Sequence, residues 1–369
     1  MNDFTEIFFA KSYEKEGSDF FRAYGAKTII TCPDKKMKGL KPKPLRTCRF
    51  CNLKYGQVFF KKEAHIISRL LGNEYLVSDF ECDICNSLFS TYESHLSHFI
   101  GPTRAFLKLY GVQENYKYKS PNKKSKIENY GLYGLENSFS ISREDVQDQT
   151  FHFDREKGLT KMLLTKHSYS PLSVYKSILK IALSCLSDED AKDYKLAFEY
   201  IRTSNLDGKL KGVTNMQIYS LPPGTGYSIP FASLYEKRDK NARLCTHVFS
   251  LTFLNQIYQI VLPLNKNDLP FYDNSLIDIM YCSPLFADEE SANSVQITQK
   301  HLDMSSSDLV KGEVDTIYLQ YDPKENANAK VFDPRTNEIK DDGFNFNAIK
   351  QLVFMPSDSK IVLPPKGKE

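Results

Sequence analysis

Residues 48–99 read CRFCNLKYGQVFFKKEAHIISRLLGNEYLVSDFECDICNSLFSTYESHLSHF, and this stretch determines the expected fold of the first third of the chain. Two Cys-x2-Cys pairs bracket a single histidine, His65. One such pair folds back on one metal ion, and two pairs supply the four thiolates of a closed tetrahedral zinc site. We therefore predict a structural Zn²⁺ bound by Cys48, Cys51, Cys82 and Cys85.

The residues between and after the cysteines predict two strands and a helix. Val58-Phe59-Phe60 favours a strand, and His65 lies at or near its end. After the second cysteine pair, apolar residues recur every three or four positions, which indicates a helix with one apolar face. Asn86 and Glu93 are seven residues apart and share a different face of that helix. The expected order is strand, loop, strand, helix, with zinc joining the outer ends.

This arrangement resembles the HNH endonuclease family over about residues 45–100. The resemblance is carried by the two cysteine pairs, Ala64-His65-Ile66, Leu71-Gly72-Asn73 and the segment from Cys82 through Asn86 to Phe89. It is greatest for the zinc-containing members whose last motif residue is asparagine instead of histidine. The resemblance implies a ββα fold that holds a catalytic divalent metal. The expected fold class is α+β, a zinc-stapled ββα-metal module followed by a mixed α+β C-terminal domain.

His65 is the expected catalytic base. Phosphodiester hydrolysis needs a group that activates water, and a neutral imidazole titrates near working pH. The resemblance implies the same role. The alternative is a core histidine with satisfied hydrogen bonds, but its position inside the zinc module favours catalysis.

Asn86 is the expected ligand of a catalytic Mg²⁺ or Mn²⁺, since its amide oxygen suits a hard cation that keeps most of its waters. The resemblance places a metal-binding residue at the same position, and the alternative is a helix N-cap. Many family members carry an acid directly before the histidine, where this chain has Ala64. Glu93 shares a helix face with Asn86 and is the preferred substitute ligand. Glu63, in a strand, would point to the face opposite Ala64.

The family's middle asparagine has more than one candidate here. Asn73 is available and is our assignment, while Ser78 or Asp79 lies at the more usual spacing before the second cysteine pair. His95 and His98 follow on the predicted helix, and we expect both to be exposed.

The charge distribution predicts a nucleic-acid surface. Residues 1–130 carry 22 Lys and Arg against 14 Asp and Glu, a net charge of +8, whereas the remainder carries 27 against 32, a net charge of −5. Between Lys35 and Lys62 there are ten basic residues and no acidic one. Such a run beside a zinc site suits the DNA backbone, although a solvated lysine loop is the alternative. The predicted DNA contacts are Lys41, Lys43, Arg46, Lys61 and Lys62.

The rest of the chain predicts a second domain without a catalytic motif. We expect the nuclease domain over residues 1–115, a basic linker over 116–130, and an α+β accessory domain over 131–369 with helices at about 171–202 and a β-rich part at 213–320. The first helix starts near Pro171 and carries one apolar stripe, the second covers 188–202, and the β-rich runs 248–253 and 257–262 suggest a hairpin. Sensing, specificity or oligomerisation suits this domain. Four histidines there are isolated in sequence, and we interpret them as structural: His152, His167, His247 and His301.

These observations predict a metal-dependent HNH endonuclease that hydrolyses DNA, in bacterial restriction or anti-phage defence, with the C-terminal domain controlling target choice or activation. The alternatives are a zinc-finger DNA-binding protein without catalysis and an RNA-directed nuclease. The expected partners are DNA, a second copy in a homodimer, and an activating ligand or defence-system partner. No run of 18 apolar residues and no leader are evident, so we expect a cytoplasmic protein without membrane association.

Overall fold

The computed structural model describes residues 8–106, 117–129, 139–145, 148, 150–154, 156–203, 210, 212–222, 227–272, 278–286, 288–320, 331–333, 338–340 and 349–354. The fold is of the mixed α+β class, as the sequence predicts. The chain forms two compact units, and each unit combines two separate stretches. The first comprises residues 1–97 and 169–309, and the second comprises residues 98–168 and 310–369.

The first unit is built on a six-stranded antiparallel sheet with the strand order β15-β10-β13-β12-β11-β2. The edge strand β2 comes from the N-terminal region, so the start of the chain completes a sheet whose other strands follow residue 214. The strand bounds are β2 Tyr24–Thr31, β10 Asn215–Ser220, β11 Tyr227–Lys237, β12 His247–Leu254, β13 Gln256–Val261 and β15 Thr298–Asp303.

The predicted hairpin between the runs 248–253 and 257–262 is confirmed as β12 and β13. Phe253 pairs with Gln256, which leaves Leu254 and Asn255 as the turn. Leu254 has a φ of 51°, a left-handed conformation that suits a tight hairpin turn. The Asn255 side chain donates to the Leu221 oxygen at 2.7 Å, so the turn is tied to the neighbouring strand.

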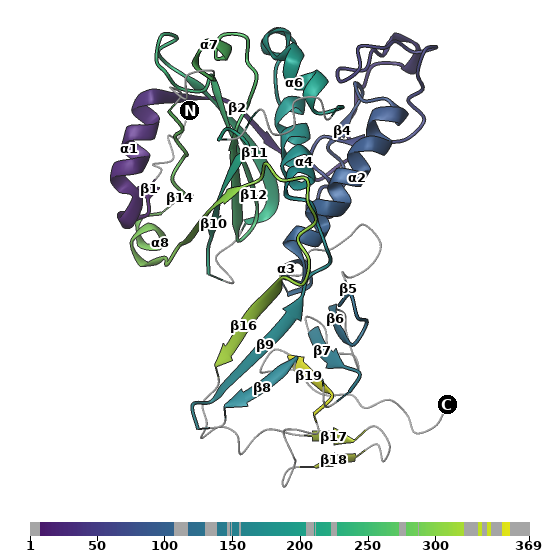
Figure 1. The fold of residues 1–369 in the computed structure, drawn as a ribbon, viewed down its shortest axis with the longest axis vertical. Coiled ribbons are helices and arrows are strands. Elements are labelled where there is room, and N and C mark those ends of the chain that lie inside the picture. Colours follow the sequence, from purple (N-terminus) through teal and green to yellow (C-terminus); the bar gives the residue numbers. More distant parts are fainter. Residues whose placement is uncertain are drawn as a thin grey trace. The chain divides into compact units, whose positions relative to one another are not determined.

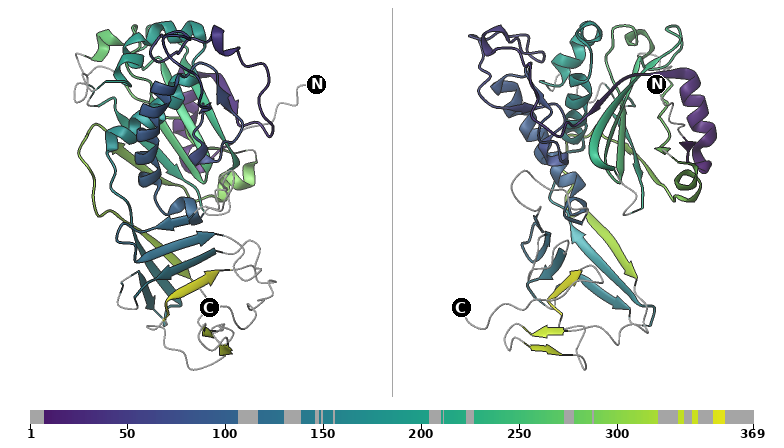
Figure 2. Two further views of the ribbon diagram at one scale, coloured as in Figure 1. Left: turned by 90° about the vertical axis from the view of Figure 1, so that its right-hand side faces the viewer. Right: turned by 180° about the vertical axis from the view of Figure 1, so that it is seen from behind.

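The helix α4, Pro171–Ser184, confirms the helix predicted at that proline, and Ser170 caps it by accepting from the Ser173 amide. The sequence predicted one apolar stripe, but nearly the whole helix is buried, including Lys176 and Lys180. A helix buried on all sides packs between two layers. Figure 1 shows α4 between the sheet and α2, with α1 on the other side of the sheet, and the rear view in Figure 2 shows the same order.

The remaining elements of the first unit are short except for α1 and α2. The second predicted helix, 188–202, is divided into α5, η4 and α6. The bounds are β1 Phe8–Phe9, η1 Lys11–Tyr13, α1 Glu14–Ala23, η2 Lys43–Leu45, β3 Ala64–His65, η3 Arg69–Leu71, β4 Val77–Ser78, α2 Asp83–Ile100, α5 Asp188–Ala191, η4 Lys192–Tyr194, α6 Lys195–Tyr200, α7 Leu269–Tyr272, β14 Leu285–Phe286 and α8 Glu289–Ser294.

The second unit consists of small antiparallel sheets, ordered β16-β9-β8, β19-β7-β6-β5 and β17-β18. Its core is built around Tyr118, Ile127, Ile141, Met162 and Leu164. The bounds are α3 Thr103–Phe106, β5 Lys117–Lys119, β6 Ser125–Asn129, β7 Phe139–Arg143, β8 Phe151–Asp154, β9 Leu159–Thr165, β16 Val314–Gln320, β17 Val331–Asp333, β18 Glu338–Lys340 and β19 Gln351–Phe354.

The stretch 116–130, predicted as a basic linker, is paired sheet over most of its length. Lys117–Lys119 and Ser125–Asn129 form the antiparallel strands β5 and β6, and residues 116 and 130 lie outside the described residues. Tyr118 and Ile127 are directly opposite each other and buried, so two apolar residues among many lysines are enough to anchor the pair. Lys117, Lys119 and Lys126 lie on the other face of the pair, and Lys123 and Lys124 lie in the turn between the strands.

Among the described residues, none of the helices combines the length and the apolar character needed to span a bilayer.

Candidate functional site

The four cysteines converge on one point, as their spacing predicts. The Sγ atoms of Cys48, Cys51, Cys82 and Cys85 all lie within 4.8 Å of one another. Cys51 Sγ and Cys82 Sγ are 3.8 Å apart, which matches the ~3.8 Å between sulfurs of a tetrahedral site with Zn–S bonds of ~2.3 Å. The set therefore fits a structural metal such as zinc, and a closed set of four thiolates leaves no position for a reacting water.

Hydrogen bonds to sulfur organise the cluster. The Cys82 amide lies 3.5 Å from Cys48 Sγ. The pKa of Cys48 is lowered to about 5, mainly by the hydrogen bond from the Cys85 thiol. Conversely, burial raises the pKa of Cys82 to about 11. The Cys48 sulfur is thus the one most easily deprotonated, and its neighbours stabilise the negative charge. A bound cation would stabilise the thiolate form of all four cysteines.

The strands β3 and β4 lie between the cysteine pairs, and the helix α2 begins within the second pair, so the three elements form a strand–strand–helix unit. Ala64–His65 (β3) pairs antiparallel with Val77–Ser78 (β4), and α2 follows directly. The strand predicted at 58–60 does not form, since Val58 makes only an isolated bridge with Tyr55, and the first strand of the unit lies further along the chain, at Ala64–His65. The Asp83 carboxylate accepts from the amides of Lys61 and Lys62 at 3.1 and 2.9 Å, and so joins the start of α2 to the segment before β3.

Asn73 holds the loop between β3 and β4. Its Nδ2 donates to the oxygens of Ile67 and Leu76 at 2.5 and 2.9 Å, and its Oδ1 accepts from the Leu76 amide at 2.8 Å. The side chain is 1% exposed. Asn73 therefore has a positioning role. The other candidates differ, since the Ser78 hydroxyl only accepts from Phe80 and the Asp79 carboxylate accepts from the Lys41 amide.

His65 is buried between Asn73 and Glu63. Its Nδ1 lies 3.4 Å from Asn73 Nδ2, and its Nε2 lies 3.6 Å from Glu63 Oε1. Both amide hydrogens of Asn73 already point at carbonyls, so this contact leaves either neutral tautomer open to His65. Burial lowers the pKa of His65 to about 4, although the Glu63 carboxylate opposes this effect. The imidazole is therefore neutral at physiological pH, the state that a general base requires.

We expect His65 to remain neutral well below the usual histidine pKa. An NMR titration of its imidazole Cε1–H should give a midpoint near 4. The unfolded chain protonates near ~6.5, so the contribution of His65 to the free energy of unfolding falls as the pH drops from ~6.5 toward 4. The Cε1–H signal of His65 is assigned by its absence from the spectrum of His65→Gln. A midpoint near 6.5 would show that the imidazole is solvated, in conflict with its burial.

Glu63 is the acid that comes closest to His65, and the sequence argument preferred Glu93. The signal was available: Glu63 and His65 are two apart, so in an extended segment both lie on one face. Glu63 is half exposed and also contacts Lys36 Nζ at 3.4 Å. A carboxylate therefore does lie beside His65, and Glu63 supplies it instead of position 64.

Asn86 lies inside α2, so the N-cap alternative is wrong. Its amide donates to the Cys82 oxygen at 2.9 Å, a regular helical hydrogen bond, and its side chain is half-buried. Glu93 lies two turns later, and its charge adds to the effect of burial in raising the pKa of Glu81. Within the described part of the chain, no group of three His, Cys, Asp or Glu ligand atoms contains His65 or Glu93. The catalytic-metal roles of Asn86 and Glu93 stay predictions.

A buried ion pair connects α4 to the histidine. Lys180 Nζ lies 3.1 Å from Glu81 Oε2, with side chains 3% and 0% exposed, and it also donates to the backbone oxygen of His65. Burial raises the pKa of Glu81, while the charge of Lys180 opposes this. Local sequence patterns do not predict the contact of Lys180 with His65, because the two residues are 115 positions apart. Lys180 also lies in a helix of largely apolar residues.

Removing Lys180 should destabilise the protein strongly. Lys180→Met leaves Glu81 as an unpaired buried carboxyl group, and breaking such a pair costs about 3–5 kcal/mol of the free energy of unfolding. The double variant Lys180→Met with Glu81→Leu should lose less than the single variant, because no charge is then stranded. Urea unfolding of the two single variants and the double variant measures this. Additive losses would contradict the pairing.

The predicted DNA-contacting residues lie at the surface next to this unit. Lys41, Lys43, Lys61 and Lys62 are exposed, and Arg46 is half-buried with its Nε donating to the Lys41 oxygen at 2.7 Å. Because the Lys41 amide donates to Asp79 at 2.8 Å, the basic loop is fixed to the hairpin that contains His65.

Arg49 belongs to the same basic run but has a structural role. Its guanidinium donates to the oxygens of Ser184 and Leu186 at the end of α4 at 3.2 and 2.8 Å, and it pairs with Asp188 at 2.6 Å. It also lies 4.1 Å from the centre of the Phe80 ring. This residue therefore joins the cysteine region to α4, and its charge is not available for a ligand.

Comparison with protein-family models, with curated proteins and with solved structures gave no match.

Proposed function

We propose that residues 45–100 form an HNH-type endonuclease module that hydrolyses DNA phosphodiester bonds. The observation that carries the proposal is the position of His65. It is a neutral, buried imidazole on the first strand of a strand–strand–helix unit, in which the four-cysteine cluster joins the segment before the strands to the first turn of the helix. Pure binding of nucleic acid requires none of these features around a histidine, which favours catalysis over a zinc-finger role.

In this proposal the imidazole of His65 accepts a proton from the attacking water. Its Nε2 faces the half-exposed Glu63, whereas Nδ1 faces buried Asn73, so Nε2 is the nitrogen that water can approach. Asn73 acts as a positioning residue through the carbonyls on both sides of the loop. The Lys180 ammonium group donates to the backbone oxygen of His65 and so holds the same strand in place. Each contact restricts where the base can point.

A divalent cation would complete the reaction by neutralising charge on the leaving 3′ oxygen. Asn86, half-buried in the first turns of α2, is the proposed protein ligand, with Glu93 or Glu63 as the acid. The described residues offer few donors there, which suits Mg²⁺ or Mn²⁺ that retains most of its waters. The exposed lysines of the basic loop would hold the phosphate backbone.

The C-terminal part of the chain would set target choice or activation, in restriction or anti-phage defence. Support comes from α4, which reaches His65 through Lys180 and the cysteine region through Arg49. A displacement of α4 would therefore move the base, which gives a ligand or a second copy of the chain a route to regulation.

The test of substrate class is incubation of the full chain with labelled double-stranded DNA, single-stranded DNA and RNA of one sequence, in Mg²⁺ and in Mn²⁺. We expect cleavage of DNA that EDTA abolishes. Cleavage of RNA alone would transfer the proposal to an RNA-directed nuclease. Binding of DNA without cleavage in either metal would contradict the nuclease proposal and favour the zinc-finger DNA-binding protein without catalysis.

A further inference from the structure

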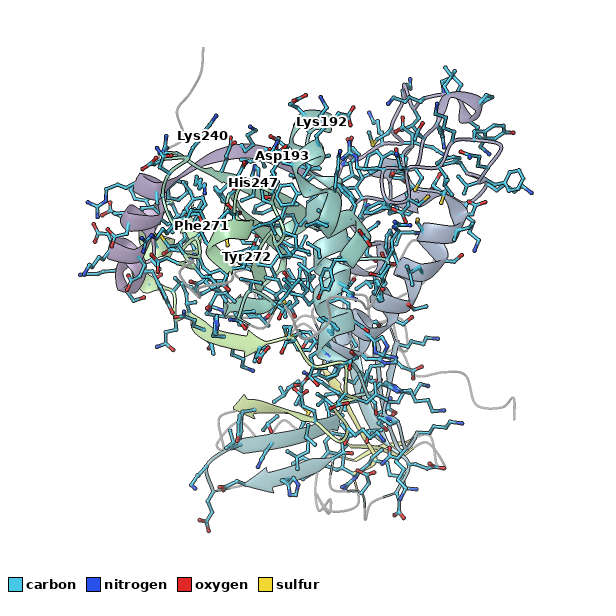
Figure 3. All side chains as sticks on the ribbon, turned by 45° about the horizontal axis from the view of Figure 1, so that its top comes forward. Lys192, Asp193, Lys240, His247, Phe271 and Tyr272 are labelled. Carbon is cyan, nitrogen blue, oxygen red and sulfur yellow. The ribbon has the colours of Figure 1, made fainter. Side chains whose placement is uncertain are left out.

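A second group of metal-ligand side chains lies on the sheet, away from the cysteines. One ligand atom from each of Asp190, Glu236 and His247 lies within 4.8 Å of the other two. They come from α5, β11 and β12, so residues that are isolated in the sequence meet in the fold. Figure 3 labels His247 in this region, below Asp193 of the segment that follows α5.

The backbone fixes this arrangement. Glu236 and His247 are directly opposite each other on the antiparallel strands β11 and β12. Directly opposed residues project to the same face with Cβ atoms ~5 Å apart, a spacing that suits two ligands of one ion. Asp190 lies in the acidic start of α5, which Ser187 caps by accepting from the Asp190 amide at 3.0 Å.

His247 provides the second, independent observation. The residue is 2% exposed, and its Nε2 has no hydrogen-bond partner among the described residues. Its Nδ1 lies 2.8 Å from the Tyr194 hydroxyl. When Nδ1–H donates to that hydroxyl, Nε2 keeps a lone pair that no described residue satisfies, in a ring that lies beside two carboxylates. A buried nitrogen left without a partner destabilises the fold, unless a cation accepts its lone pair.

Lys27 supplies a positive charge to part of this group. Its Nζ lies 2.8 Å from Glu236 Oε2 and 3.6 Å from Asp190 Oδ1, and its side chain is 36% exposed. The ammonium balances the two carboxylates, but His247 Nε2 remains unpartnered. A flexible, partly exposed lysine is a cation that a tighter-binding ion can displace.

We propose that Asp190, Glu236 and His247 bind a divalent transition-metal ion, and that Lys27 holds the carboxylates in the metal-free state. One imidazole and two carboxylates favour Mn²⁺ or Zn²⁺ over Mg²⁺ or Ca²⁺, which prefer oxygen ligands alone. Three protein ligands leave coordination positions open to water, unlike the closed cysteine cluster.

The test is a Mn²⁺ titration of the full chain loaded with one equivalent of Zn²⁺, which the four thiolates take up first, with free Mn²⁺ measured by EPR. Thiolates favour zinc over Mn²⁺, so the cysteine cluster stays out of the measurement. The proposed nuclease site also accepts Mn²⁺. Binding at the Asp190 site is therefore identified by comparing wild type with variants of that site. Asp190→Asn should weaken one binding event at least tenfold. Lys27→Met should tighten the same event several-fold, since the competing ammonium is removed.

Asp193→Asn is the matched control. It makes the same change three residues away, where the carboxylate pairs with Lys266 at 2.6 Å and lies outside the group. This variant should bind Mn²⁺ as wild type does. Both Asp190 and Lys27 are partly exposed, so their variants are expected to fold, and thermal melts without metal check this. Equal Mn²⁺ binding by wild type, Asp190→Asn and Lys27→Met would overturn the proposal and leave Lys27 as the resident cation.

Discussion

Replacing His65 with alanine should reduce DNA cleavage by about 10²–10⁴-fold, the usual contribution of a positioned general base. The loss should appear in the single-turnover rate, because the base acts only as the water attacks. Affinity for DNA, measured without divalent metal, should stay within about twofold, since the exposed lysines rather than His65 would hold the backbone.

His301→Ala is the matched control for this change. It removes an imidazole from the edge strand β15, where the ring contacts Gln217, and should leave the rate unchanged. Zinc content and melting temperature of His65→Ala must match those of wild type for the comparison to hold. A His65→Ala rate within threefold of wild type would remove the base assignment even if the chain cuts DNA.

Replacing Cys51 with serine should remove one equivalent of zinc and unfold the region between the cysteine pairs. Zinc binding to four-ligand modules is worth about 10–16 kcal/mol of apparent folding free energy, so loss of one thiolate costs several kcal/mol. Cys51 is the only half-buried member of the cluster, and the other three are buried. Serine there changes the packing least, so the effect reports on the metal.

Cys32→Ser supplies the control for this change, because Cys32 is half-buried and lies outside the cluster. Zinc released by a thiol reagent and urea unfolding should match wild type in Cys32→Ser and fall in Cys51→Ser. Equal zinc content and stability in both variants would show that the cluster is held by packing and thiol hydrogen bonds alone.

Local patterns in the sequence predicted the elements that depend on near neighbours. The two cysteine pairs converge because a Cys-x2-Cys turn is self-contained. The helix at Pro171 and the β12–β13 hairpin follow from capping and turn residues. The strands at 117–129 were missed because two buried residues, Tyr118 and Ile127, outweigh a run of lysines.

The contacts around the sites depend on distant segments, which local patterns do not encode. Lys180 reaches His65 across 115 residues, and the signal that a buried lysine gives is weak in a helix rich in apolar residues. His247 is isolated in sequence, yet strand register places Glu236 beside it. Sequence spacing did place Glu63 on the His65 face, but the preference for a helical ligand obscured it.

The most direct test of the nuclease proposal is incubation of supercoiled plasmid with the zinc-loaded full chain and Mg²⁺ or Mn²⁺, followed by analysis of the product ends. We expect nicked circles with 5′-phosphate and 3′-hydroxyl ends from wild type, and intact plasmid from His65→Ala. Plasmid that the wild-type chain binds but leaves supercoiled in both metals would contradict the account.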